Sequence, residues 1–176
     1  FVGKEIIHCA IFKKKDDRTI YNMIYKDGKS GNTMMKRFPV SSITRGKDYS
    51  LTKSIKSSKV TYFTANPNGE AETITVNLKK SPKLKTLKID IDFAELGIKG
   101  KGAGGNIVTK NNVKKIELKY EGVSTLSARK IWFDDTVKRL NVDQRGDLLG
   151  AFKPEDKILT ILQSGEIELK SFDISN

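Results

Sequence analysis

The sequence predicts an all-β fold. Apolar residues alternate with polar ones at a period of two wherever they gather, and turn-forming Gly, Asn and Asp residues separate these runs. No window of a dozen residues carries the apolar stripe of a helix. A chain of 176 residues suits one domain of moderate size, so we expect a single domain over residues 1–176.

The individual strands follow from the alternation. Ile74, Val76 and Leu78 share one face of a segment whose other face is polar, as half-buried antiparallel strands do. The same alternation predicts strands at residues 87–93 and 116–120. Other runs are apolar on both faces and predict inner strands, at residues 6–12, 20–25 and 158–162.

A strand–turn–strand unit recurs along the chain. We place hairpins of this form near Thr19, Val60, Gly105 and Lys157. Repeats of roughly 40–50 residues with about four strands each are typical of propeller blades and not of a sandwich. The sequence therefore predicts about four blade-like units, each of four strands.

Positive charge is concentrated in the first half of the chain. The protein has 33 Lys and Arg against 21 Asp and Glu, a net charge of +12. Residues 1–88 hold 19 Lys and Arg and only 7 Asp and Glu, so the whole surplus lies there. Solubility requires a net charge, but it does not require that charge to be concentrated in one half of the chain. The uneven distribution therefore indicates a surface that binds a polyanion. A solvated lysine-rich surface is the alternative.

Catalytic and metal-binding patterns are weak. With Cys9 the only Cys and His8 the only His, disulfide frameworks and Cys- or His-rich metal sites are excluded, and we expect the two to form a core pair. The glycines from Gly100 to Gly105 precede an extended segment, which excludes a dinucleotide fingerprint and leaves a structural turn or a basic phosphate-approaching loop. Adjacent acids such as Asp16 and Asp17 are typical of turn caps. We expect no catalytic residue and no metal.

Basic clusters are the remaining functional signal. They lie at strand ends and loops, where a ring of blades would join them into a curved cationic track that binds phosphates without reading sequence. The scattered aromatic residues favour duplex over single-stranded DNA. The strongest candidate DNA contacts are Lys36, Arg37, Arg45 and Lys47, followed by Lys13, Lys14, Lys15, Lys99, Lys101, Arg129 and Lys130.

Four segments together resemble a known family: residues 1–12, 65–72, 98–110 and 129–140. They are similar to the C-terminal region of the A subunit of bacterial type IIA topoisomerases, topoisomerase IV-like or gyrase-like. The resemblance implies a β-pinwheel whose neighbouring blades exchange strands and whose basic rim bends or wraps duplex DNA. It also implies that this chain is a fragment of a larger subunit of an ATP-dependent type II topoisomerase. Cleavage would reside elsewhere in that subunit, and ATP hydrolysis in the B subunit.

The same resemblance sets further expectations. Its partners would be double-stranded DNA, the rest of the A subunit and the ATPase B subunit. No cofactor is expected in this chain, whereas ATP and magnesium are implied for the whole enzyme. The location would be the bacterial cytoplasm, at the nucleoid, with a role in chromosome segregation. No segment matches the gyrase box Gln-Arg-Arg-Gly-Gly-Lys-Gly, which favours bending in a topoisomerase IV-like enzyme. Gyrase-type wrapping, and a protein-interaction propeller with an acidic partner, stay open as alternatives.

Overall fold

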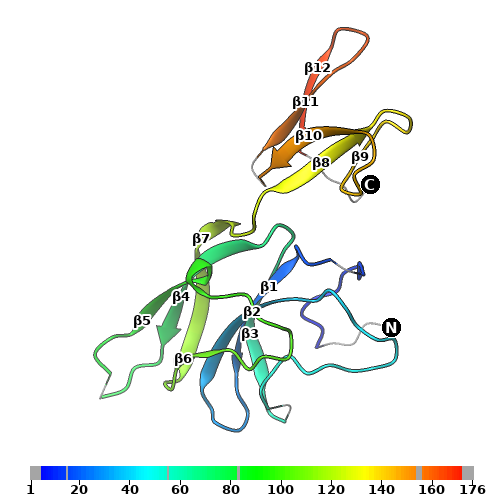
Figure 1. Ribbon diagram of the computed structural model, residues 1–176. Helices are drawn as coiled ribbons and strands as arrows, with labels where there is room; N and C mark the ends of the chain where they lie inside the picture. The colour runs from blue at the N-terminus through cyan, green and yellow to red at the C-terminus, as the bar shows by residue number, and fades with distance from the viewer. Residues whose placement is uncertain (1–4, 15, 55, 83, 154–155, 172–176) are drawn as a thin grey trace. The chain divides into compact units, whose positions relative to one another are not determined.

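A computed structural model describes residues 5–14, 16–54, 56–82, 84–153 and 156–171 (Figure 1). The chain forms two compact units, unit 1 over Phe1–Leu126 and unit 2 over Ser127–Asn176. The strands form small antiparallel sheets, and the helical structure among the described residues is a single 3₁₀ turn, η1 (Phe93–Glu95). The all-β prediction is therefore confirmed.

Unit 1 contains two sheets. The first sheet has the order β3-β1-β2-β6 and the second has the order β5-β4-β7. The strands of the first sheet are β1 (Ile20–Lys26), β2 (Thr33–Pro39), β3 (Lys59–Asn66) and β6 (Asn106–Thr109), and those of the second are β4 (Glu70–Leu78), β5 (Lys88–Asp92) and β7 (Val113–Ser124).

The inner strand β1 is buried on both faces, as its apolar run predicts. Successive side chains of a strand point to opposite faces, so Ile24 packs with the core of the second sheet while Met23 and Tyr25 pack in a separate cluster on the other face. Loops cover that other face. The first sheet thus lies between the second sheet and a layer of loops.

The core between the sheets rests on the predicted alternation of β4 and β5. Ile74, Val76 and Leu78 of β4 are buried together with Ile91 and Phe93. Completely burying a side chain of this size contributes about 1.5–3 kcal/mol. The alternation predicted for residues 116–120 holds only in part, because β7 bulges against β4 and leaves Leu118 and Tyr120 exposed.

Two expected hairpins are wrong. The chain turns at residues 67–69 as predicted, but β3 pairs with β1 while β4 pairs with β5 and β7. Similarly, β6 returns to the first sheet and pairs with β2, and the next strand, β7, completes the second sheet. Local alternation identifies a strand but carries no information about its partner, so the residue pattern alone did not predict which strands the two sheets share between them.

Unit 2 contains a three-stranded sheet and a hairpin. The sheet has the order β10-β8-β9, with β8 (Arg129–Asp134), β9 (Arg139–Asn141) and β10 (Asp147–Phe152), and the hairpin pairs β11 (Lys157–Ile161) with β12 (Ile167–Ser171). The hairpin predicted near Lys157 is confirmed. Its strand β11 is not the inner strand that we expected, because it has one partner among the described residues and leaves Leu159 and Ile161 exposed.

The inner strand expected at residues 6–12 is also wrong. Residues 6–12 form no strand, and Ile7 and Ile11 are exposed. The expected core pair fails with it, since Cys9 is a free, exposed thiol. His8 is an exposed residue too, although its ring contacts the rings of Tyr21 and Phe63 with centroids 5.8 and 5.3 Å away.

Candidate nucleic-acid interface

The buried ammonium of Lys36 joins two loops of unit 1. Lys36 is 3% exposed on the loop-covered face of β2. Its Nζ donates to the carbonyls of Leu51 (3.0 Å), Lys101 (2.6 Å) and Ala103 (2.7 Å). An ammonium has three protons, so each is used. The acceptors belong to the loop of residues 40–58 and to the glycine-rich loop of residues 97–105, both of which can be followed in Figure 1.

Tyr25 on the neighbouring strand makes a second link between the same loops. Its hydroxyl donates to the carbonyl of Gly104 and accepts from the backbone N–H of Lys53 at 3.1 Å. Gly105 lets the glycine-rich loop lie this close, because it has φ +83° and an added Cβ would lie 2.3 Å from the carbonyl oxygen of Met35. The glycine-rich loop is thus tied by hydrogen bonds to Tyr25 and Lys36.

Burial also changes the acidity of Lys36, whose three hydrogen bonds to the two loops we call the clamp. Loss of water around the Lys36 side chain lowers its pKa to about 8. The ammonium therefore predominates at neutral pH, the state in which all three carbonyls have a donor.

Cations lie around one aromatic ring on the outer side of the two loops. Lys47 Nζ is 5.5 Å and Lys101 Nζ 4.9 Å from the centroid of the Tyr49 ring, within range of cation–π attraction. Lys101 Nζ also donates to the carbonyl of Ser42 at 2.9 Å, which joins the loops a third time. Hydrogen bonds with the Thr44 side chain and backbone N–H lower the pKa of the Tyr49 hydroxyl.

The two loops therefore present basic side chains from distant parts of the sequence. Arg45 lies in the tight turn where the N–H of Lys47 donates to the carbonyl of Thr44 at 3.2 Å. Lys99 is held by its own N–H, which donates to the carbonyl of Arg37 at 3.0 Å. We call the set Arg45, Lys47, Lys99 and Lys101 the loop surface. Arg45, Lys47 and Lys99 are exposed and Lys101 is half-buried.

Arg37 is a structural residue, not a surface contact. It is 2% exposed on the opposite face of β2. Its guanidinium donates to the side chain of Asn22 (2.9 Å), to the carbonyls of Phe93 (3.1 Å), Gly69 (3.0 Å) and Glu70 (3.4 Å), and to the hydroxyl of Thr125 (3.0 Å). Burial lowers the pKa of Arg37. Apart from Asn22, which is on β1 of the first sheet, these acceptors lie on or beside the second sheet, so Arg37 ties the two sheets together.

The candidate DNA contacts therefore divide into two groups. Lys36 and Arg37 were expected on the rim, and this is corrected, because their donors are used by internal oxygens and their side chains are out of reach of a phosphate. Lys13 and Lys14 are exposed, as is Lys130 on β8, while Arg129 is half-buried. Lys15 lies outside the described residues.

The sequence reasoning missed a further basic cluster at the ends of the strands. Lys26 and Lys59 lie directly opposite one another where β1 pairs with β3. Neither is adjacent to another Lys or Arg in the sequence, so no basic pair marks them. Tyr49 was also missed as a site residue, although its position between basic residues of the same loop was a usable signal.

Acidic residues act as caps and ion-pair partners. Asp16 accepts from the N–H groups of Arg18 and Thr19, both at 3.0 Å, as expected for a turn cap, and Asp134 accepts from Thr136 N–H at 3.0 Å. Asp90 pairs with Lys119 at 2.6 Å. Within the described ranges, no three His, Cys, Asp or Glu side chains are grouped to hold a metal ion.

The family comparison decides the identity of the domain. The Topoisomerase C-terminal domain family of Bacteroidota matches residues 1–121 and 139–176, nearly the whole chain. The chain belongs to this family. The resemblance to a topoisomerase C-terminal region is thereby confirmed. No curated protein and no solved structure matches the chain significantly.

Family membership indicates which partners to expect for the loop surface. As part of a topoisomerase, this C-terminal domain has DNA and the other topoisomerase subunits as its expected partners. Two loops that are hydrogen-bonded to one another, and whose cations form no ion pair with any residue that the structure describes, suit a ligand with a phosphate backbone. No helix in the described part of the topoisomerase domain has the length and hydrophobicity to cross a membrane.

Proposed function

We propose that this topoisomerase C-terminal domain binds double-stranded DNA through its phosphates, without reading sequence, and bends it for strand passage by the rest of the enzyme. The loop surface is the observation that carries the proposal. Its cations project from backbone that Lys36 and Tyr25 hold in place. Fixed cations lose less side-chain and loop freedom on binding than cations on an unclamped loop.

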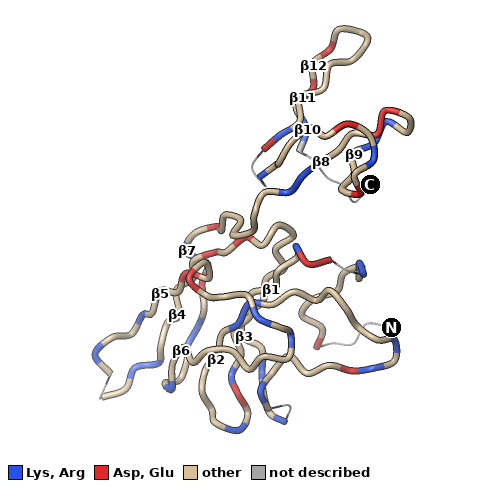
Figure 2. The backbone as a smooth tube through the Cα atoms, viewed as in Figure 1, with Lys and Arg blue, Asp and Glu red and all other residues tan. Residues whose placement is uncertain are grey.

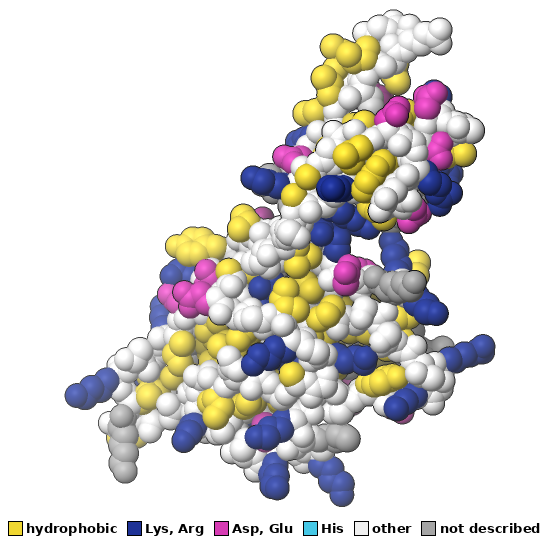
Figure 3. All heavy atoms as spheres, in the orientation of Figure 1, with side chains coloured by type: hydrophobic (Ala, Val, Ile, Leu, Met, Phe, Trp, Pro, Cys, Tyr) yellow, Lys and Arg dark blue, Asp and Glu magenta, His cyan; other side chains and the backbone are white. Residues whose placement is uncertain are grey.

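Charge supports unit 1 as the main DNA-binding part. Its residues 1–126 carry 25 Lys and Arg against 12 Asp and Glu, a net charge of +13. Figure 3 shows Lys and Arg side chains projecting from many places on this unit. Bending a site of about 20–30 base pairs costs about 1–6 kcal/mol, so several phosphate contacts must combine to offset it. Lys13, Lys14, Lys15, Arg129 and Lys130 remain proposed as additional contacts.

The interleaved sheets support a β-pinwheel as the architecture. The chain leaves the first sheet after β3, returns to it with β6, and completes the second sheet with β7. Neighbouring blades of a pinwheel exchange strands in a comparable manner. We propose about four blades over the chain, with the sheets of unit 1 as two of them.

The proposal extends to the whole enzyme. We assign the chain to the A subunit of a topoisomerase IV-like type IIA enzyme that acts in chromosome segregation, because no segment matches the gyrase box. Cleavage and ATP hydrolysis, with ATP and magnesium, would belong to other parts of the enzyme. The rest of the A subunit and the ATPase B subunit would then be partners, in the cytoplasm at the nucleoid.

The first test is a salt titration of duplex binding. The loop variant, Arg45→Gln with Lys99→Gln, should weaken binding to a duplex of about 30 base pairs by about tenfold, equally for unrelated sequences. Losing two phosphate contacts should also flatten the slope of log K against log salt by about 1.8. Fluorescence anisotropy measures both quantities.

A matched variant in unit 2 controls for net charge. Arg139→Gln with Lys157→Gln removes the same charge from exposed positions and should change affinity by less than roughly twofold. Equal weakening by both variants would contradict the loop surface as the DNA contact. Energy transfer between dyes at the duplex ends should report shortening on binding. Displacement of the duplex by heparin with no change in end-to-end distance would instead favour a general polyanion binder.

A further inference from the structure

A cavity of about 400 Å³ opens in unit 1 at residues that the proposed function does not use. It lies where β1 and β4 end and where β2, β3 and β7 begin. Its lining is Lys26, Thr33, Lys59, Val60, Thr61, Lys79, Asn111, Asn112, Val113, Lys114, Lys115 and Ile116. We call it the lysine pocket. It shares no residue with the loop surface.

The charge of the lysine pocket is one-sided. Five of its lining residues are lysines and none is Asp or Glu. Among the described residues, Lys115 is the one lysine of the five in an ion pair, with Glu117 at 2.6 Å. The nearest polar partner of Lys26 Nζ is weak, the Asn112 side-chain oxygen at 3.5 Å. The other four lysines of the pocket therefore have no carboxylate counter-charge within the described ranges.

Strand pairing forces two of these charges together. Lys26 and Lys59 are direct cross-strand partners in the β1–β3 register. Like charges placed opposite one another destabilise a strand pair, and Lys79 and Lys114 approach from the second sheet at the same cavity. An anion between them would convert this repulsion into attraction.

The rest of the lining restricts the kind of anion. The side chains of Val60, Val113 and Ile116 are half-buried and supply an apolar wall, and the Asn111 and Asn112 amides can donate to oxygen. Lysine ammonium groups bind phosphate as point charges. A cavity of this volume is within the size range of small-molecule sites. A concave site suits a compact anion better than the outside of a broad duplex.

We infer that the lysine pocket is an anion site separate from the loop surface, and that it takes a free oligophosphate, a compound with two or more linked phosphate groups. Two linked phosphates carry enough charge to meet several lysines at once. A single phosphodiester carries one charge and leaves most of them unpaired. The inference concerns unit 1 alone and goes beyond duplex binding.

Calorimetric titration of the full chain with tripolyphosphate tests the inference. The pocket variant, Lys59→Gln with Lys114→Gln, should raise the Kd for tripolyphosphate at least about tenfold. Both residues are exposed and form no ion pair among the described residues, so the variant should stay folded. In the unaltered protein, tripolyphosphate should shift the amide NMR signals of Lys59, Asn111 and Asn112.

The loop variant is the matched control, because it removes the same charge elsewhere on unit 1. It should leave the Kd for tripolyphosphate within roughly twofold while weakening duplex binding. The inference would be overturned if both variants weaken tripolyphosphate binding equally. It would also be overturned if the unaltered protein does not bind tripolyphosphate at millimolar concentrations. If the pocket variant loses as much affinity for the duplex as for tripolyphosphate, the pocket is a DNA contact and the inference is overturned as well. If the duplex fails to bind at all, the tripolyphosphate result still stands.

Discussion

The two units use their cations in different ways. Unit 1 has a net charge of +13, whereas residues 127–176 carry 8 Lys and Arg against 9 Asp and Glu, a net charge of −1. In unit 2, Lys138 pairs with Asp135, Arg145 with Asp143 at 3.0 Å, and Lys170 with Glu168 at 2.5 Å. The tube in Figure 2 shows acidic and basic positions close together along the chain in this unit. Its cations are largely balanced by neighbouring acids.

Burial differs between the units as well. Unit 1 contains an apolar core between its sheets and two fully enclosed cations, Lys36 and Arg37. Among the described residues of unit 2, Ile131 alone is buried. Apart from Lys115 and Lys119, which pair with acids, most cations of unit 1 therefore either hold the structure together or remain available to a ligand. The number of cations in a unit therefore does not by itself locate a binding surface. Whether a cation is available to a ligand depends on its position relative to the core and to acidic residues.

The largest expected effect follows from removing the internal guanidinium. Arg37→Met should destabilise unit 1 by about 3–5 kcal/mol, because it leaves the buried side-chain oxygen of Asn22 without its donor and removes one donor each from the carbonyls of Phe93 and Gly69. Arg145→Met in unit 2 should cost less than about 0.5 kcal/mol, since its partner Asp143 is largely exposed. Urea unfolding of both variants measures the difference. Similar losses would contradict the contrast between the units.

Strands could be predicted from the sequence because their signal is local. Alternation at residues 20–25 and at Ile74 to Leu78 predicts β1 and β4 directly, since side-chain direction depends on neighbouring residues only. The pairing partner of a strand, in contrast, does not depend on its neighbours in the sequence. The turn at residues 67–69 is consistent with a β3–β4 hairpin, yet β3 closes the first sheet and β4 opens the second.

The site was predicted in part for the same reason. The loops around Arg45 and Lys99 are marked by Gly and by basic residues, so their exposure follows from the sequence. The burial of Lys36 had a signal that was not used. Lys36 shares a strand face with Met34 and Phe38, both buried, so alternation places its side chain inward. The cross-strand pair at the lysine pocket had no signal, because it depends on register.

The clamp between the loops should have the next largest effect. Lys36→Met leaves the carbonyls of Leu51, Lys101 and Ala103 without a buried donor and should destabilise unit 1 by about 1–3 kcal/mol. Duplex affinity should fall with it, although no exposed cation is removed, because the loop surface loses its fixed backbone.

A lysine in the same loop provides the control for the clamp. Lys56→Met removes an exposed charge and no internal hydrogen bond of the side chain, so stability should change by less than about 0.5 kcal/mol. Hydrogen exchange of the Lys101 and Ala103 amides in folded protein separates the two roles. Faster exchange there in Lys36→Met, with β4 amides unchanged, is the expected result; an unchanged rate together with lost duplex binding would contradict the clamp.

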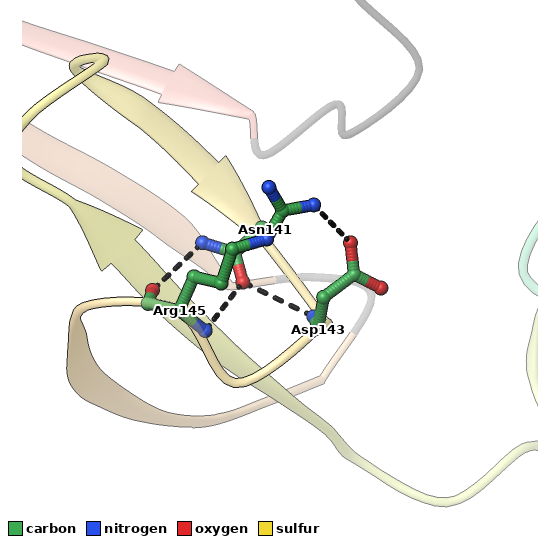
Figure 4. A network of polar contacts seen from close by, with 3 residues as sticks. All are labelled: Asn141, Asp143 and Arg145. Atoms are coloured by element: carbon green, nitrogen blue, oxygen red, sulfur yellow. Dashed lines mark hydrogen bonds and ion pairs between the residues drawn. The ribbon is translucent and has the colours of Figure 1, made fainter.

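Apart from the controls, the smallest expected effect lies in unit 2, at the connection between β9 and β10. The Asn141 side chain accepts from the N–H groups of Asp143 and Arg145, both at 3.1 Å, and donates to the carbonyl of Arg145 at 2.9 Å (Figure 4). Asn141→Ala should destabilise unit 2 by about 0.5–1 kcal/mol, because the freed groups are exposed and water replaces most of each bond. Amide exchange at Asp143 and Arg145 should accelerate, while duplex affinity stays unchanged because the connection belongs to the charge-balanced unit. A fall in duplex affinity with this variant would show that unit 2 takes part in DNA binding beyond the proposed contacts at Arg129 and Lys130, and would remove the contrast between the two units.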